Sequence, residues 1–447
     1  LMNGTLSSKN IEKRYLSFFW VTILVFGIFV MLHPIYEVVA SLFANMYHPK
    51  TDYIGLSSIY FAVPYLILIS CFLYRQQKRS TLSDYFVILI TLLYFIPGSV
   101  LFVYGNWSIT YYMFHLLSYL SLSIANEFFP KIQFSLKPSL SRPREAVSFM
   151  CYSISIPVIL ITLYYNGLHI NLNLNDVYNL RSEWSDSGMP NIFNYYMPFA
   201  ARVTPILLVT TLKQRRVLLS SLLIFSQLVS FSFGGMKYTL FALILGILFY
   251  FFGQKVDARK IIICFSVFVG ICLIECLLSN EQLPLLTIFT LRRTSFVPNQ
   301  IGSYFFSFAQ ENDYLYYSGS FLRSFLNYPY QDTFPHIIGN YAFGLPDLGA
   351  NTGLFAEGFS QIGWLSLPVY AILYIVSFRL YSACCRAFKR TSLSHIPLLG
   401  VLLYASTFID GAFFSVLLTQ GAFLAALYLY VLSQCIINRS HEKRTTL

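Results

Sequence analysis

The sequence predicts an all-α integral membrane protein that crosses the bilayer about twelve times. Of its 447 residues, 56% are hydrophobic and only 11% are charged, a balance that a water-soluble protein of this size does not show. Apolar runs of roughly the 20 residues that a spanning helix needs recur along the whole chain. Basic residues gather between alternate runs. We therefore expect residues 1–447 to form a single transmembrane domain.

Twelve apolar runs are the expected spans. In the first half of the chain they are 16–40, 56–74, 85–103, 109–124, 146–165 and 195–212. In the second half they are 217–233, 238–252, 261–278, 359–378, 396–409 and 413–436. The first run is too long for a signal-peptide core and lacks a small-residue cleavage site, so we expect it to be a retained helix.

The distribution of Lys and Arg predicts the orientation. Of these 30 residues, 23 lie in seven segments between or beside alternate spans: 9–14, 75–79, 131–144, 213–216, 255–260, 379–390 and 439–444. Because Lys and Arg accumulate in short cytoplasmic loops, we expect both termini in the cytoplasm. The net charge of +11 is then a signal of topology. Basic residues spread over seven segments form no single patch, so no nucleic-acid partner is predicted.

Two outer connections are long: the loop 166–194, and the loop 279–358 between spans nine and ten. Loops longer than about 15 residues are usually functional or disordered, and the second is too rich in aromatic residues for disorder. We expect short helices at the membrane surface within it, at 295–309 and 318–327. A twelve-helix carrier has two similar halves, and the sequence contains no such repeat. A carrier is therefore the less favoured, alternative interpretation.

Seven Lys and Arg residues lie outside the cytoplasmic segments, and six of them are candidates for binding a pyrophosphate: Arg181, Arg202, Lys237, Arg292, Arg293 and Arg323. Arg202 falls within an expected span, and Lys237 follows two glycines between two spans. Ionisable groups at such depth are costly and usually mark a binding site or an ion pair. Arg provides forked donors and Lys a point charge for an anion. The alternative is that Arg202 pairs with an acid and Lys237 reaches the lipid headgroups.

A general base is expected in the same outer loops. His336 is the only histidine of the loop 279–358, and histidine titrates near neutral pH. Its carboxylate competitors are Asp332, Asp347 and Glu357. Clusters of Cys or His with zinc spacing are absent from the sequence, so we predict neither a metal nor a cofactor.

From about residue 166 to the last span, the chain resembles the Wzy-type polymerases of O-antigen and capsule repeat units. The resemblance rests on Arg181 in its outer loop, on the turn 233–237, and on the loop exit 351–364. This exit looks like the Asn-Thr-Gly…Glu…Gly pattern that enters a helix in these polymerases. Arg323 followed by Gly339 also resembles an Arg-to-Gly spacing of some members.

The resemblance implies a metal-independent glycosyltransferase in a bacterial inner membrane, with its active site facing the periplasm or exterior. A polymer on undecaprenyl pyrophosphate would be the donor and one lipid-linked repeat unit the acceptor, with a chain-length regulator protein as a further partner. The six cations would hold the leaving pyrophosphate, and His336, Glu357 or Asp332 would deprotonate the attacking hydroxyl. The alternatives are a ligase that moves finished polymer onto a lipid core, and a lipid-linked oligosaccharide flippase.

Overall fold

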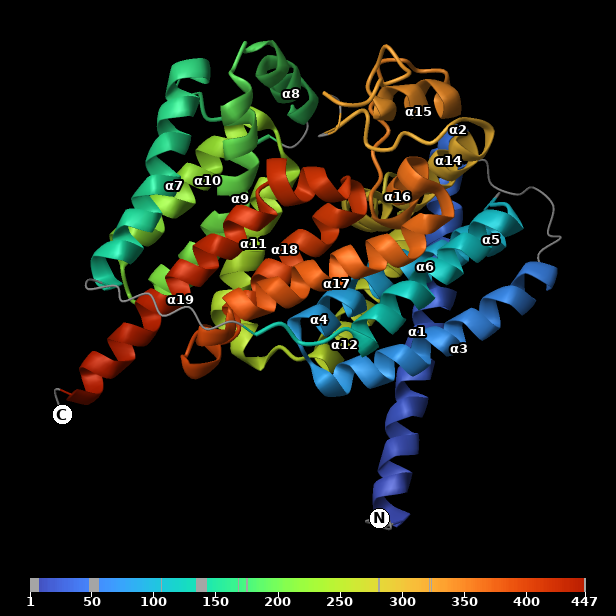
Figure 1. The fold of residues 1–447 in the computed structure, drawn as a ribbon, viewed down its shortest axis with the longest axis horizontal. Helices are drawn as coiled ribbons and strands as arrows, with labels where there is room; N and C mark the ends of the chain where they lie inside the picture. Colours follow the sequence, from blue (N-terminus) through green and yellow to red (C-terminus); the bar gives the residue numbers. More distant parts are fainter. Residues whose placement is uncertain are drawn as a thin grey trace. The chain divides into compact units, whose positions relative to one another are not determined.

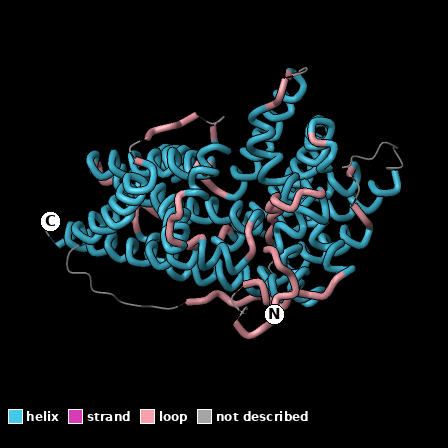
Figure 2. The backbone as a smooth tube through the Cα atoms, turned by 90° about the horizontal axis from the view of Figure 1, so that it is seen from above, coloured by secondary structure: helices cyan, strands magenta, loops and turns pink. Residues whose placement is uncertain are grey.

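The computed structural model describes residues 8–47, 56–105, 107–133, 143–167, 169–173, 176–279, 282–320, 322 and 324–445. Within these ranges every regular element is a helix, as Figure 2 shows. Nine helices of this described part are long and apolar enough to cross a membrane. The protein is therefore an all-helical, polytopic membrane protein, as its composition predicts.

Each of these nine helices coincides with a predicted span. The remaining three predictions have other counterparts. The span 109–124 lies in α6 (Ile109–Phe128), and 396–409 matches the shorter α18 (Ile396–Asp410). The run 413–436 is interrupted before α19 (Ala422–Thr445), which leaves a shorter apolar helix. The total of twelve and the orientation stay predictions.

The chain forms two compact units, and each draws on segments that are far apart in the sequence. Unit 1 comprises Leu1–Pro130, Asp257–Ser377 and Ala405–Phe413. Unit 2 comprises Lys131–Val256, Phe378–Tyr404 and Phe414–Leu447. Helices α17 (Ser366–Cys384) and α18 contribute residues to both.

Unit 1 is built around one buried helical run. Its helices are α1 (Ser8–Leu42), α2 (Ala44–Tyr47), α3 (Leu56–Arg79), α4 (Leu82–Ile90), α5 (Ile96–Tyr104), α6, α12 (Ala258–Leu278), α13 (Leu285–Thr287), α14 (Val297–Glu311), α15 (Phe334–Phe343), α16 (Leu354–Ile362) and parts of α17 and α18 (Figure 1). A π-helical segment, Thr91–Phe95, joins α4 to α5. Within the run Leu82–Tyr104, 94% of the residues of an 18-residue apolar stretch are buried. Helix α1 packs along α3, α5 and α12, and α14 packs on α16.

The helix α14 differs from the surface helix expected at 295–309. Most of its residues are buried in unit 1, where the ring of Phe306 lies 4.3 Å from that of Phe359 on α16. An aromatic face suits a protein core as well as a membrane interface. The other expected surface helix, 318–327, forms turns where the structure describes it.

A network of charges connects the ends of three helices in unit 1. The carboxylate of Asp84, at the start of α4, is 3.0 Å from the guanidinium of Arg79 on α3. Asn126 on α6 donates to the same carboxylate over 2.8 Å. Glu127 accepts from Arg75 and Arg79 at 2.5 and 2.8 Å. Because Asp84 is fully buried, the network ties α3, α4 and α6 together at one end.

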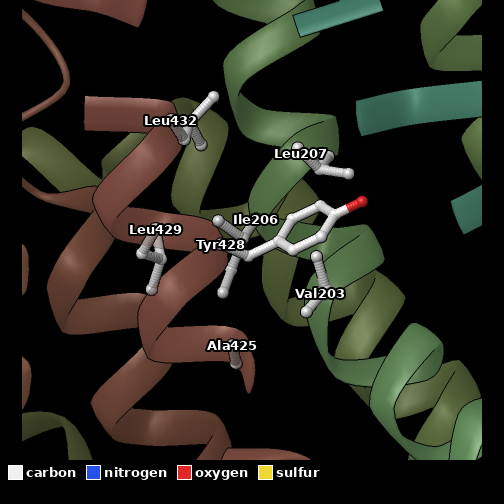
Figure 3. A pocket seen from close by; sticks show the side chains of 7 residues that line it. All are labelled: Val203, Ile206, Leu207, Ala425, Tyr428, Leu429 and Leu432. Carbon is white, nitrogen blue, oxygen red and sulfur yellow. The ribbon is translucent and has the colours of Figure 1, made fainter. Parts of the chain in front are cut away.

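Unit 2 surrounds α9. Its helices are α7 (Pro143–Asn166), α8 (Val177–Asp186), α9 (Asn191–Lys213), α10 (Val217–Gly234), α11 (Lys237–Phe252), α19 and parts of α17 and α18. Helix α9 packs against α7, α10, α11 and α19. Between α9 and α19 lies a small depression lined by Val203, Ile206, Leu207, Ala425, Tyr428, Leu429 and Leu432 (Figure 3). This apolar lining marks a helix contact and contains no charged group.

Candidate functional site

The turn between α10 and α11 in unit 2 is shaped by Gly235. Its φ of +58° is left-handed, and its N–H caps α10 by donating to the Phe231 carbonyl. A Cβ at this position would lie 2.8 Å from the Val177 carbonyl oxygen and 3.0 Å from Cβ of Leu180. Only glycine therefore allows α8 to pack so closely on the turn. Helix α11 then begins at Lys237.

Helix α8 carries Arg181 to this turn. Cγ of Arg181 lies 3.5 Å from the point that a Cβ on Gly235 would occupy. The ring of Trp184, one helical turn further along α8, lies 4.5 Å from the ring of Phe233 on α10. These contacts hold α8 beside the end of α10, as Figure 1 shows. Arg181 thus lies against the turn, and Lys237 directly follows it. The Arg181 side chain is exposed and that of Lys237 is half-buried.

Arg202 is buried in the middle of α9, with 7% of its surface exposed. One guanidinium nitrogen donates to the Pro198 carbonyl over 3.0 Å, and the other donates to the side-chain oxygen of Gln420 over 2.6 Å. The guanidinium also lies over the rings of Tyr238 and Tyr404, at 4.6 and 5.8 Å from their centroids. Because Tyr238 directly follows Lys237, these contacts connect Arg202 to the turn.

The partner amide of Arg202 comes from a break in the last apolar run. A π-helical segment, Ser415–Thr419, is capped by Gln420, and α19 begins only after Gly421, whose φ is +77°. A Cβ on Gly421 would lie 2.7 Å from Cβ of Phe199, and the Tyr404 hydroxyl donates to the Gly421 carbonyl over 3.2 Å. Packing thus fixes the break and aims Gln420 at α9. We call Arg181, Arg202 and Lys237 the cation cluster.

In unit 1, hydrogen bonds and close packing fix the exit of the long loop 279–358 at its small residues. Thr352 donates to the Pro298 carbonyl over 2.9 Å, and the N–H of Gly353 donates to the Ile409 carbonyl over 2.8 Å. A Cβ on Gly353 would lie 2.1 Å from the Phe408 carbonyl oxygen, and one on Gly358 would lie 2.8 Å from the Tyr370 ring. Each glycine of the Asn-Thr-Gly…Glu…Gly pattern therefore occupies a position with no room for a side chain.

Between these glycines, α16 carries a buried carboxylate, Glu357, of which 6% is exposed. The hydroxyl of Tyr370 on α17 donates to Oε2 of Glu357 over 2.5 Å. The Phe413 N–H and the side chain of Gln361 also hydrogen-bond to this carboxylate. These hydrogen bonds fix the position of the Glu357 carboxylate, and a carboxylate held in one position is a candidate general base.

His336 lies beside the same loop exit. It is the third residue of α15 and half-buried. Its Cδ2 and Nε2 lie 3.6 Å from the point that a Cβ on Gly349 would occupy, and the side-chain nitrogen of Asn351 lies 3.8 Å from that point. The Ala350 N–H donates to the Pro335 carbonyl over 3.0 Å, which holds α15 to the exit. Asp332 is exposed in the segment before α15.

The two neighbouring arginines of unit 1 lie in a π-helical segment, Ile288–Phe296. Glu275 on α12 accepts from the N–H groups of Leu286 and Thr287, each over 2.8 Å, and so fixes the start of this stretch. The Arg292 guanidinium lies 3.7 Å from the centroid of the Phe43 ring. Arg293 is exposed, and its charge acts on Asp410 at the end of α18.

The predicted site residues thus fall into two groups. Unit 2 contains Arg181, which lies against the turn between α10 and α11, Lys237, which directly follows that turn, and Arg202, whose guanidinium contacts the Tyr238 ring. Unit 1 contains Arg292, Arg293, His336, Asp332 and Glu357. Arg323 lies outside the described residues.

Sequence reasoning missed four residues of these sites: Gln420, Asp410, Tyr317 and Tyr370. Gln420 precedes a glycine within the apolar run 413–436, and Asp410 directly follows the apolar run 396–409. Both polar residues could therefore have been noticed in the sequence. The two tyrosines are among 34 in the chain and left none.

In the described ranges, no group of three or more His, Cys, Asp or Glu side chains could hold a metal ion. Comparison of the chain with models of known families, with curated proteins and with solved structures found no match.

Proposed function

We propose that this protein is a polysaccharide polymerase of the metal-independent, integral-membrane type. It would join undecaprenyl-pyrophosphate-linked oligosaccharide repeat units at the outer face of a bacterial inner membrane. The observation that carries this proposal is the cation cluster, and above all Arg202, which lies buried in a helix long and apolar enough to span the bilayer. A guanidinium in such a place is costly, and a forked donor suits a diphosphate.

The cation cluster would stabilise the leaving group. A hydroxyl of the acceptor repeat unit attacks the anomeric carbon of the donor, a glycosidic bond forms, and the bond to the lipid diphosphate breaks. Negative charge then develops on the diphosphate, where Arg and Lys donors lower the barrier in a site shielded from water.

The base in this proposal is Glu357. The attacking hydroxyl must lose a proton as the glycosidic bond forms, and a positioned carboxylate can accept it. Glu357 is buried and held by three donors. His336, beside Asn351, is the second candidate for the same step, because histidine titrates near neutral pH.

The experiment that tests this function is deletion of the gene, followed by electrophoresis of the surface glycan. A polymerase predicts surface material reduced to single repeat units. Loss of all surface glycan with units trapped inside would indicate a flippase, and polymer that stays on its lipid carrier would indicate a ligase.

Complementation with variants then tests the cation cluster. Arg202→Ala should give single repeats at a normal protein level. The matched control is Arg216→Ala in the same unit, whose guanidinium donates to the Ser148 hydroxyl over 3.0 Å, and it should restore the full ladder. A normal ladder from Arg202→Ala would contradict the assignment.

A further inference from the structure

A chain of three hydrogen-bonded groups runs from the long outer loop to the buried carboxylate of unit 1. The Tyr317 hydroxyl donates to the Tyr370 hydroxyl over 3.2 Å. The Tyr370 hydroxyl in turn donates to Oε2 of Glu357 over 2.5 Å. Tyr370 and Glu357 are buried, whereas Tyr317 is half-buried in the loop. Both hydroxyl donors point the same way, toward the carboxylate, and a hydroxyl group that donates one hydrogen bond can also accept one.

The backbone at Tyr316 and Tyr317 is strained, and hydrogen bonds to Gln361 hold it in this conformation. Tyr316 and Tyr317 have φ values of +46° and +61°, and this left-handed conformation is unfavourable for a residue other than glycine. The N–H of Tyr317 donates to the side-chain oxygen of Gln361 over 2.8 Å, and that of Tyr316 donates to the Gln361 carbonyl over 3.0 Å. Strain that the surroundings maintain in this way is typical of functional sites.

We propose that Tyr317, Tyr370 and Glu357 form a proton relay, in which Tyr317 is the group that contacts the attacking hydroxyl of the acceptor sugar. This inference rests on the proposed function and deepens it. Three protons move together as the sugar oxygen attacks the anomeric carbon. The sugar proton passes to the Tyr317 oxygen, the Tyr317 proton to the Tyr370 oxygen, and the Tyr370 proton to Glu357. Both tyrosines end neutral, Glu357 ends protonated, and the electron pair of the broken bond leaves with the diphosphate.

The concerted transfer avoids a tyrosinate. Burial raises the pKa of the Tyr317 hydroxyl to about 12, so this group stays protonated and can give up its proton only while it receives another. The relay also explains how a carboxylate buried beneath the loop could serve a substrate outside it. Tyr317 is then a catalytic residue, whereas Gln361 positions it.

The relay is tested with the full-length protein in lipid nanodiscs and lipid-diphosphate-linked repeat units. Tyr317→Phe and Tyr370→Phe should each lower kcat by about 100-fold, the size of a general-base contribution, with an unchanged KM for the acceptor. Tyr316→Phe is the matched control, since the neighbouring ring is exposed and its residue contributes a backbone N–H to α16. It should keep wild-type kinetics.

Infrared spectroscopy adds a readout that does not depend on turnover. The carboxyl band lost in Glu357→Gln should shift in Tyr370→Phe and, by less, in Tyr317→Phe, because hydrogen bonds in a chain polarise one another. Wild-type kcat in Tyr317→Phe, or a Glu357 band that neither tyrosine affects, overturns the relay while the polymerase stands. A wild-type protein that makes no polymer rejects the polymerase, and with it this role for Tyr317.

Discussion

The guanidinium of Arg202 and the side-chain amide of Gln420 meet at 2.6 Å, across 218 positions of sequence. Arg202 lies within α9, and Gln420 lies at the break before α19. The hydrogen bond therefore accounts both for the polar Gln420 in an apolar run and for the burial of Arg202 in a spanning helix. The same contact orients the guanidinium beside Tyr238 and the turn that begins α11.

Replacing Gln420 by Glu separates the fold of the cation cluster from its affinity for anions. A carboxylate at this position would pair with Arg202, so the protein should be at least as stable as the wild type. The new negative charge should weaken the binding of undecaprenyl pyrophosphate about tenfold, a loss of about 1.4 kcal/mol. A titration in nanodiscs measures the Kd.

The matched control for this change is Gln254→Glu. Gln254 is exposed beyond the other end of α11 and donates to the Ser392 carbonyl over 3.0 Å. The Gln254→Glu substitution adds the same negative charge to unit 2 and should leave the Kd for undecaprenyl pyrophosphate unchanged. Equal effects of the two variants would mean that the anion does not bind near Arg202.

Gly235→Ala tests the packing of α8 on the turn. Two costs add here: the left-handed φ, about 1–2 kcal/mol, and the contact with the Val177 carbonyl oxygen at 2.8 Å. Gly188→Ala has a similar φ of +64°, with no atom within 4 Å of the new Cβ. Gly235→Ala should therefore reduce the free energy of unfolding by more than Gly188→Ala, and should also slow polymerisation by displacing Arg181. Equal losses in a detergent denaturation series would exclude a role for the α8 contact.

Asp84→Asn should destabilise unit 1. The buried carboxylate accepts from Arg79, Asn126 and the N–H of Thr81, and an amide cannot replace its charge. Because Arg79 is partly exposed, we expect a loss of about 2 kcal/mol, less than for a fully buried pair. The control is Asp257→Asn, which replaces the exposed N-cap of α12 by an equally good N-cap residue. It should change the free energy of unfolding by no more than about 0.5 kcal/mol. Thermal denaturation in detergent compares the two.

His395 should make unit 2 less stable in acid. It is buried before α18, and neither ring nitrogen has a hydrogen-bond partner among the described residues. Burial, with the nearby charge of Lys213, lowers its pKa to about 4, against about 6.5 in an unfolded chain. Between these values the unfolded chain binds more protons, so the free energy of unfolding falls as the pH decreases from about 6.5 to 4. His395→Asn should flatten this part of a stability–pH curve, and an unchanged slope would contradict the assignment.

Length and hydropathy were sufficient to predict the helical spans, because a run such as 261–278 has to be helical in a bilayer. They were insufficient at 413–436, since an average over the run hides the break that Gln420 and Gly421 introduce. They also misplaced α14, because aromatic residues such as Phe306 signal burial without saying whether protein or lipid covers them.

For the candidate sites, the sequence was informative where a residue was unusual for its surroundings. Arg202 and Lys237 stood out as cations far from the predicted cytoplasmic segments, and the structure brings the Arg202 guanidinium to the ring of Tyr238, the residue after Lys237. Tyr370 could not be identified in this way, since a tyrosine in a spanning helix is ordinary. Only the fold of α16 against α17 brings it to Glu357.

The most direct test of the central claim is to supply the purified protein, in proteoliposomes, with lipid-diphosphate-linked repeat units as its sole substrate. The proposed polymerase should form a ladder of polymers without added metal and release one lipid diphosphate for each new glycosidic bond, and Arg202→Ala should lose both activities. Bound but unpolymerised repeat units, or a ladder that Arg202→Ala forms equally well, would contradict it.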